Sequence, residues 1–315
     1  MPPPAAPVPS LMARADAFLG LPSFDRRRLW APRFRGAAAS RLHLCWRIFA
    51  FAYALSVSAF DASLFVGGRY LEYLTVQSVW TVVAYFALQL ALHVAVRARP
   101  ALGAGARFDE LSLARGPAAA AWAAAQRAAL VLFTIAVSFE LVVVVLYWLL
   151  LASPQPSPLR AWDNAESHGV KLLLMYAELL VTPARPGADA MLSLPLAAGA
   201  VYLCVNAGVT LQSGRPVYGI LNWRSAGSAV IVVGALAFLC VAFALAAAGA
   251  SARDAAVARA RAGKPSPLPS DASAAAAFPD AFDDDPAPLP CAWCCRGRAP
   301  AAAAAAVAER LLPAA

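Results

Sequence analysis

The stretch AALVLFTIAVSFELVVVVLYWLLL, residues 128–151, decides the fold class of this chain. It contains one charged residue, Glu140, and consists otherwise mainly of leucine, valine and aromatic side chains. A helix needs roughly 20 predominantly apolar residues to cross the hydrocarbon core of a bilayer, and this stretch exceeds that length. Residues 128–151 therefore predict a transmembrane helix.

Similar apolar runs recur on both sides of this stretch and predict an all-α, polytopic transmembrane helix bundle of about six spans. The expected spans are residues 44–66, 74–96, 128–151, 169–183, 190–212 and 228–250. Asp61 interrupts the first, and the fourth is short and carries polar residues. Only 14% of the residues are charged, whereas soluble domains carry about a quarter. The low content of charged residues and the recurring long apolar runs thus both favour a membrane protein.

The chain divides into three parts by composition: a Pro/Arg-rich N-terminal arm over residues 1–40, a six-helix transmembrane domain over 41–250, and an Ala/Pro-rich tail over 251–315. The tail has few large apolar side chains and cannot bury a core, so we expect a disordered segment. The first ten residues are Pro-rich and lack the apolar core of a cleavable signal peptide. Insertion is then expected to rely on the first spanning helix.

Most of the 26 Lys and Arg residues fall in the arm, between the second and third spans, and in the tail. Because positively charged loops stay in the cytosol, both termini are predicted to be cytosolic, in the plasma membrane or an endomembrane. The net charge of +8 then reflects topology and anionic lipid. No nucleic-acid-binding motif accompanies it, so membrane lipid is the expected partner, as solvent and as a candidate substrate.

Polar residues at membrane depth are the candidate functional residues, because burying them in hydrocarbon is costly. Thr75 follows the glycine pair at 67–68 and lies just inside the second expected span. Its hydroxyl could serve chemistry, or it could cap the helix or bond back to a carbonyl. His168 opens the fourth span from the same, non-cytosolic side as Thr75. A shared site is therefore geometrically allowed.

At helical spacing, His168, Lys171, Met175 and Glu178 lie on one face of the fourth span, which should face the bundle interior. A structural Lys171–Glu178 ion pair with an interfacial histidine is the alternative to a functional stripe. The spacing of Asp163 and Glu166 resembles a capping box and predicts a helix start there.

Glu140 lies near the middle of its span, with apolar neighbours on both sides. A functional acid, a hydrogen-bonded structural acid and a partner of Lys171 are all compatible with that position.

Several of these residues carry a resemblance to the androgen-induced-protein superfamily of six-span membrane proteins. Residues 67–75 (GGRYLEYLT), the Asn164-x-x-x-His168 spacing and Glu178 resemble that family's motifs. Residues 76–80 (VQSVW) and 217–223 (VYGILNW) are closer to its rolling stone branch. The resemblance covers about residues 40–250 and implies a six-helix membrane fold.

The resemblance also implies candidate roles, because the androgen-induced branch includes hydrolases of fatty acid esters that use a threonine and a histidine. Thr75 would be the nucleophile and His168 its base, with Asn164 as a candidate to orient His168. Glu140, Lys171 and Glu178 would support the site. The rolling stone branch is associated with myoblast fusion, so a non-catalytic scaffold or adhesion protein is the alternative. A small transporter or channel, suggested by the charged residues at membrane depth, is the third.

The tail contains three cysteines, Cys291, Cys294 and Cys295, next to a tryptophan and basic residues. Three cysteines with no histidine nearby do not make a structural zinc site, so no metal and no cofactor is expected. Cytosolic cysteines in this setting are candidates for palmitoylation.

Overall fold

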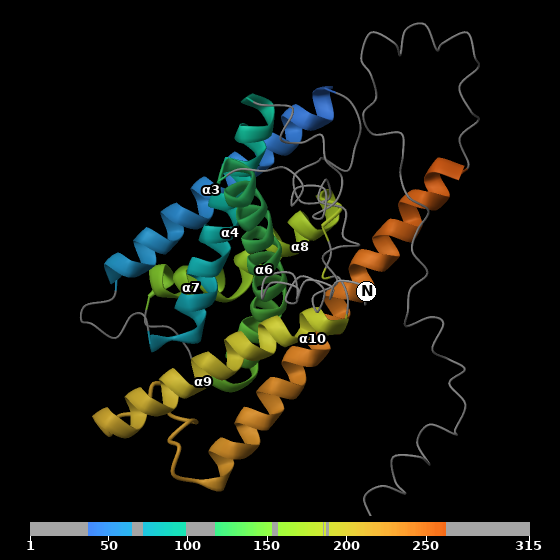
Figure 1. Cartoon of the computed structure of the whole chain (residues 1–315). Helices are drawn as coiled ribbons and strands as arrows, with labels where there is room; N and C mark the ends of the chain where they lie inside the picture. The colour runs from blue at the N-terminus through green and yellow to red at the C-terminus, as the bar shows by residue number, and fades with distance from the viewer. Residues whose placement is uncertain are drawn as a thin grey trace, which may run out of the picture. The chain divides into compact units, whose positions relative to one another are not determined.

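The computed structural model describes residues 37–64, 72–98, 117–152, 157–184, 186 and 189–262, and all regular structure in these ranges is helical (Figure 1). This confirms the predicted all-α class. The helices are α3 (Ala37–Leu64), α4 (Leu74–Ala98), α6 (Pro117–Leu146), η4 (Tyr147–Leu151), α7 (Pro158–Ala165), η5 (Glu166–Val170), α8 (Lys171–Val181), η6 (Asp189–Leu192), α9 (Ser193–Ser213) and α10 (Ala226–Ala262). The chain as far as Ala258 forms one compact unit, and of the remainder only the end of α10 is described.

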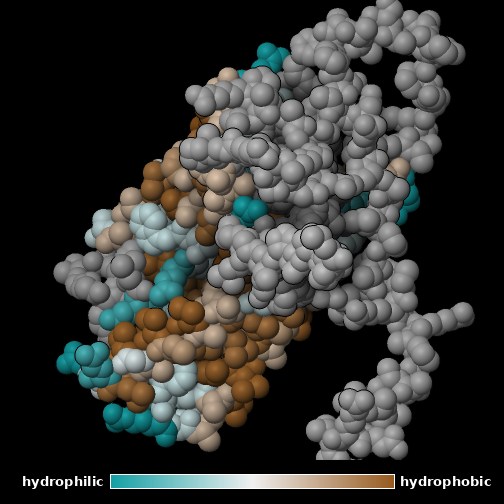
Figure 2. Space-filling model, viewed as in Figure 1, coloured by the Kyte–Doolittle hydropathy of each residue, from teal (hydrophilic) through white to brown (hydrophobic). Residues whose placement is uncertain are grey.

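Five helical stretches in the described part of the chain are long and apolar enough to cross a membrane: Ser40–Leu64, Leu74–Ala98, Ala120–Leu151, Ser193–Ser213 and Ala226–Ala260. They coincide with five of the six expected spans and establish a multi-pass, membrane-type helical protein. Large apolar side chains on α9 and α10 point outward, for example Val201, Val230 and Val233, each more than 60% exposed. Figure 2 shows this apolar surface over both helices. Such a surface suits contact with lipid.

The fourth expected span corresponds to a continuous helical run from α7 through η5 to α8. Ser167 bonds Asp61 near the C-terminal end of α3, whereas Glu178 contacts Trp46 and Arg47 near its N-terminal end. The run therefore extends along the bundle from one end towards the other, packed inside it against α6, α3 and α4. Only the α8 part of this run is apolar, so the run as a whole is too polar to be one of the five apolar membrane-spanning stretches.

Small side chains allow the helices to approach closely at the centre of the bundle. Ala50, Ala54, Ala136 and Ala246 are fully buried, beside larger aromatic residues such as Phe133. Without water to drive association in hydrocarbon, close packing of small residues is a main source of helix–helix stability in membranes.

The predicted buried face of the fourth span is confirmed, since His168, Lys171, Met175 and Glu178 are all buried. The alternative Lys171–Glu178 ion pair is wrong. The Glu178 carboxylate instead accepts hydrogen bonds from Trp46 Nε1 at 2.7 Å and Tyr85 Oη at 3.0 Å, and pairs with Arg47 Nη2 at 3.3 Å. It thereby joins α8 to α3 and α4, and pairs with a cation that sequence spacing could not single out.

Some predicted boundaries need correction. The helix expected to start at Asp163 starts earlier, with Pro158 in its first turn and Ser157 as the N-cap, whose hydroxyl accepts the Arg160 N–H at 3.3 Å. Proline in the first turn after a serine is the stronger start signal, because it needs no N–H donor there. The α10 helix continues to Ala262, past the expected start of the tail at 251. The residues expected to be disordered from 263 on, and those of the arm before Ala37, lie outside the described ranges.

Candidate functional site

A polar cavity of about 280 Å³ lies at the end of the bundle where α4 begins and η4 ends. Thr75 and His168, which are far apart in the sequence, both line it. The lining residues are Asp61, Tyr73, Thr75, Val76, Val79, Tyr147, Leu151, Asp163, Asn164, Ser167, His168 and Tyr218. The structure thus brings together the threonine and the histidine that the sequence placed at one depth.

His168 is held in the cavity wall by two π-helical segments, η4 and η5. Its backbone leaves helical geometry inside η5, with φ −117° and ψ 22°. The Tyr147 ring of η4 stacks on its imidazole, with centroids 3.5 Å apart and planes 3° from parallel. Trp148 Nε1 donates to the His168 carbonyl at 3.2 Å. Single π-helical turns inside helices are frequent at functional sites, and here they set the orientation of one ring.

The His168 imidazole is kept neutral by its surroundings. Burial, and after it the Lys171 ammonium, lowers the pKa of His168 to about 3. Its Nδ1 atom is buried and has no hydrogen-bond partner among the described residues. A neutral imidazole can accept a proton at neutral pH, although a base with so low a pKa is a weak one.

Thr75 occupies the second position of α4 and so lies inside the helix, past the N-cap at which a hydroxyl would cap it. Tyr218 takes the capping role instead, because its hydroxyl accepts the Leu74 N–H at 3.0 Å. The same tyrosine hydroxyl hydrogen-bonds the Thr75 side chain. Thr75 is therefore half-buried in the cavity wall with its hydroxyl held by Tyr218.

The loop that carries Tyr218 is anchored on both sides. The Asn222 side chain accepts the N–H groups of Arg224 and Ser225, at 3.0 and 3.1 Å, just before α10. Trp223 adopts a left-handed backbone with φ 58° and donates its Nε1–H to Asn206 Oδ1 at 2.7 Å. These contacts give a structural reason for the residues at 217–223 and fix Tyr218 above the start of α4.

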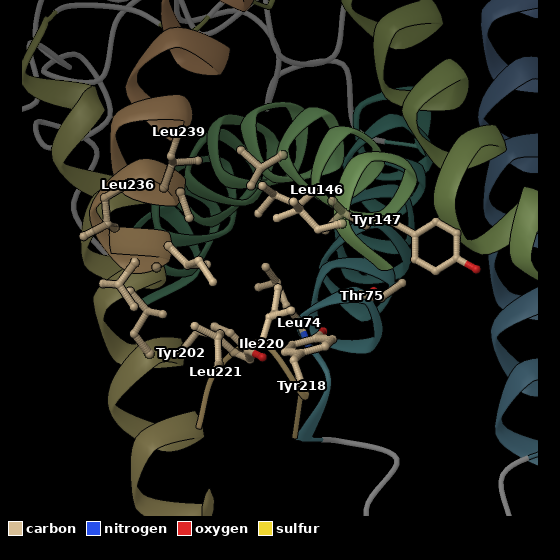
Figure 3. A pocket seen from close by; sticks show the side chains of 18 of the residues that line it. Leu74, Thr75, Leu146, Tyr147, Tyr202, Tyr218, Ile220, Leu221, Leu236 and Leu239 are labelled. Carbon is tan, nitrogen blue, oxygen red and sulfur yellow. The ribbon is translucent and has the colours of Figure 1, made fainter. Parts of the chain in front are cut away.

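A second, apolar cavity has a volume of about 90 Å³ (Figure 3) and shares lining residues with the polar one. Thr75, Tyr147, Leu151 and Tyr218 line both cavities, so Thr75 lies at their junction. The other lining residues are Leu74, Phe139, Val142, Val143, Leu146, Leu150, Gly199, Tyr202, Leu203, Ile220, Leu221, Ile231, Val232, Ala235, Leu236 and Leu239. Side chains of this kind accommodate a hydrocarbon chain.

Three carboxyl groups gather at the polar cavity, and sequence reasoning missed them as a site. The Lys171 ammonium lies 2.6 Å from Glu166 Oε2 and 3.7 Å from Asp61 Oδ2, and Ser167 donates to that same Asp61 oxygen at 3.0 Å. Asp163, nearby, lies 4.0 Å from the largely exposed Arg160. In the sequence Asp61 interrupts an expected span and Asp163 resembles a helix cap, and the signal that links them is that both acids lie at the ends of expected spans.

The other predicted supporting residues divide between the cavity and the core. Asn164 lines the cavity, whereas Glu140, Lys171 and Glu178 do not. Glu140 is fully buried and accepts a hydrogen bond from Ser78 of α4 at 2.5 Å, while the ion pairs of Lys171 are with Glu166 and Asp61. The suggested Glu140–Lys171 pair is therefore not formed, and Glu140 instead joins α6 to α4 through its hydrogen bond from Ser78.

Other candidate sites of the chain fall elsewhere. Cys291, Cys294 and Cys295 lie outside the described residues. Within the described ranges, no group of three or more histidine, cysteine, aspartate or glutamate side chains could hold a metal ion.

Comparison with models of known protein families, with curated proteins and with solved structures found no match to this chain. The function therefore has to be argued from the site itself. The site brings a hydroxyl and a neutral imidazole to the wall of one cavity, which shares lining residues with a second, apolar cavity.

Proposed function

We propose that this multi-pass membrane protein is an intramembrane lipid-ester hydrolase, with Thr75 as nucleophile and His168 as base. The observation that carries the proposal is that both side chains line one cavity, and that Thr75 also borders the apolar cavity. The resemblance of the surrounding motifs to the androgen-induced-protein superfamily points to the same two residues and is part of the proposal.

The chemistry needs a base because a free hydroxyl is a weak nucleophile. His168 accepts the Thr75 proton as the threonine oxygen attacks the ester carbonyl. The alkoxide of the substrate leaves and takes that proton, which leaves an acyl-threonine. Water, activated by His168, then attacks the acyl group and releases a fatty acid and free Thr75.

The surroundings of the two residues support these roles. Tyr218 holds the Thr75 hydroxyl, and Tyr147 holds the plane of the imidazole. Hydrogen bonds between nucleophile and base are often long in a substrate-free site and tighten when substrate binds. Because His168 is a weak base, we expect a modest rate for the acylation step.

A non-catalytic scaffold is the second candidate function, and specific contacts favour it. Glu178 joins three helices, and Glu140 joins two. In this alternative Thr75 and His168 are packing residues of a stable bundle, and their loss changes stability and not turnover. A transporter has no comparable support among the described contacts.

Hydrolysis of fatty-acyl esters by the purified chain in neutral detergent tests the proposal. Thr75→Ala and His168→Ala should each lower kcat/KM by at least about a hundredfold, the effect expected on losing a nucleophile or its base. Thr75→Ser should retain part of the activity, since it keeps the hydroxyl. Unchanged turnover in both alanine variants, with the same Tm as the wild type, would leave the scaffold as the function.

A further inference from the structure

We propose that the ligand of the two adjoining cavities is a single-chain amphiphile with an ammonium headgroup, whose cation lies in the polar cavity and whose chain lies in the apolar one. Binding itself needs no catalysis. The further statement that the ligand is a fatty-acyl ester of a cationic alcohol rests on the proposed hydrolase function.

Unpaired carboxylate oxygens in the cavity wall point to a cation. Asp61 and Asp163 are 5% and 7% exposed, and both line the polar cavity. Within the described residues, the Oδ1 atom of each is buried without a hydrogen-bond donor, as is Oε1 of the adjacent Glu166. The two aspartate carboxyls can share a hydrogen bond only when one of them is protonated, so both lack a donor when ionised. Buried acceptors without partners are costly, and a bound cation near them would offset that cost.

The charges around the cavity leave a place for one more cation. Asp61, Asp163 and Glu166 face one buried ammonium, that of Lys171, and one guanidinium, that of Arg160, whose side chain is 44% exposed. Three acids thus face one fully buried base and one base that is partly exposed to solvent, so acidic groups outnumber basic ones when all three carboxyls are ionised. An anionic headgroup would add to this repulsion, whereas an ammonium group would relieve it.

Aromatic rings select among cations. Tyr73, Tyr147 and Tyr218 line the same cavity as the two aspartates, and Tyr73 packs edge-on against Tyr218 with centroids 5.7 Å apart. Carboxylates together with several aromatic faces form the type of site that binds quaternary ammonium groups through cation–π attraction. A small metal ion would instead need three or more oxygen ligands set closely together, and none of the described residues form such a group.

The position of Thr75 fixes the orientation of the ligand. It lies where the apolar cavity meets the polar one. A chain in the apolar cavity and an ammonium beside Asp163 place the bond between them next to the Thr75 hydroxyl. An acyl ester of an amino alcohol has its ester at that position. Attack by Thr75 there releases the cationic alcohol and leaves an acyl-threonine, from which water then releases the fatty acid.

Gly199 lines the apolar cavity and offers a position at which a substitution can alter it. A Cβ atom built on it would lie 3.3 Å from Leu239 Cδ2 and 3.6 Å from Leu236 Cδ2, side chains that line the same cavity. A larger side chain at Gly199 would therefore displace these two leucines, which form part of the cavity wall. Gly199→Leu should weaken binding of long-chain probes and spare short ones.

The test measures binding of octyltrimethylammonium to the full chain in neutral maltoside detergent, with octyl sulfate and octyl glucoside as chain-matched anionic and neutral probes. The cationic probe should bind at least about tenfold more tightly than either. Asp163→Asn and Asp61→Asn should each weaken it by about tenfold, and Asp254→Asn, which lies on α10 and does not line the cavity, should have no effect.

Several outcomes would overturn the proposal. These are equal or tighter binding of octyl sulfate, unchanged affinity in both cavity variants, and tighter binding of octylphosphocholine, which would indicate a phospholipid headgroup. If the variants do not fold, the order of the three probes on the wild-type chain still decides. Hydrolysis of octanoylcholine by the wild-type chain is measured separately from binding of octyltrimethylammonium, so binding and the proposed catalysis can fail separately.

Discussion

Asp163 is the residue of the polar cavity whose charge should change near neutral pH. Burial, and after it the neighbouring Asp61 carboxyl, raises the pKa of Asp163 to about 7 from its ordinary value near 4. A raised pKa means that the carboxyl is neutral below pH 7 and negative above it. The other charged groups around it are Asp61 of α3, Arg160 of α7, Glu166 of η5 and Lys171 of α8.

Affinity for an ammonium amphiphile should therefore fall as the pH is lowered. Between pH 8 and pH 6 the ionised fraction of a group with a pKa of about 7 drops by about tenfold, and we expect affinity to follow it. The measurement is a titration of octyltrimethylammonium binding at several pH values. Asp163→Asn should bind weakly with a flat profile, and a wild-type profile equally flat over this range would contradict the assignment.

Glu178 is a single residue with a structural role, and its loss should destabilise the helix bundle. Glu178→Ala removes the partner of the buried Arg47 and of the Trp46 and Tyr85 donors. Breaking a buried pair by removing one partner typically costs about 3–5 kcal/mol. We expect a lower Tm in detergent. The matched variant Glu178→Gln removes the charge but keeps an oxygen that can accept from Tyr85 and Arg47, so it should lose less. An equal loss in both variants would show that the charge, and not these acceptor contacts, stabilises the bundle, and an unchanged Tm in Glu178→Ala would contradict the prediction.

At the scale of elements, Arg253 of α10 holds the C-terminal end of α8. Its guanidinium donates to the carbonyls of Leu179, Thr182 and Ala184, which are carbonyls at and just beyond the last turn of that helix. Free carbonyls at a helix end are stabilised by such a donor and by its positive charge. The arrangement explains how a short helix inside the bundle is fixed to the long outer helix α10.

Arg253→Ala should accordingly lower the free energy of unfolding by about 1–3 kcal/mol, as expected when buried carbonyls lose a charged donor. Thermal unfolding of the purified chain measures it. Arg259→Ala is the matched control, because Arg259 is exposed on the same helix and surface changes are usually within about 0.5 kcal/mol. Similar losses in the two variants would show that helix propensity, and not the contact with α8, is responsible.

At the scale of the whole molecule, the run from α7 to α8 decides whether the chain crosses the membrane an odd or an even number of times. The five apolar helices alone would place the two ends of the described chain on opposite sides. The α7–α8 run extends along the bundle as well, and its inclusion returns both ends to one side. Together with the distribution of Lys and Arg, this favours cytosolic termini, which stay a prediction.

Glycosylation mapping tests that orientation. An acceptor site in a flexible insertion at 213–215, on the same side as the cavity, should be glycosylated in microsomes. Acceptors fused to either terminus should remain unmodified. Modification at one terminus only would mean that the α7–α8 run does not cross the membrane.

The fold class could be predicted from the sequence because long apolar runs in a chain of this composition predict membrane-spanning helices. Residues 128–151 and four further runs predicted where five helices lie, although α6 begins at Pro117 and α10 continues to Ala262, well beyond the expected bounds. The sequence also singled out Thr75 and His168 as candidate functional residues, because burying polar groups in hydrocarbon is costly. It missed Tyr147, Tyr218 and Asp163, since tyrosines at span ends suit the membrane interface, and an aspartate ahead of an expected span resembles a helix cap.

The sequence by itself determined that this chain is a multi-pass helical membrane protein, and which few polar residues deserve a functional reading. Only the tertiary structure decided how those residues pair. Whether Glu178 pairs with Lys171 or Arg47, and whether Asp61 meets Lys171, depends on helix rotation and packing. Periodicity along one helix specifies a buried face, whereas the partner of a buried charge comes from another helix, at a distance that only packing sets.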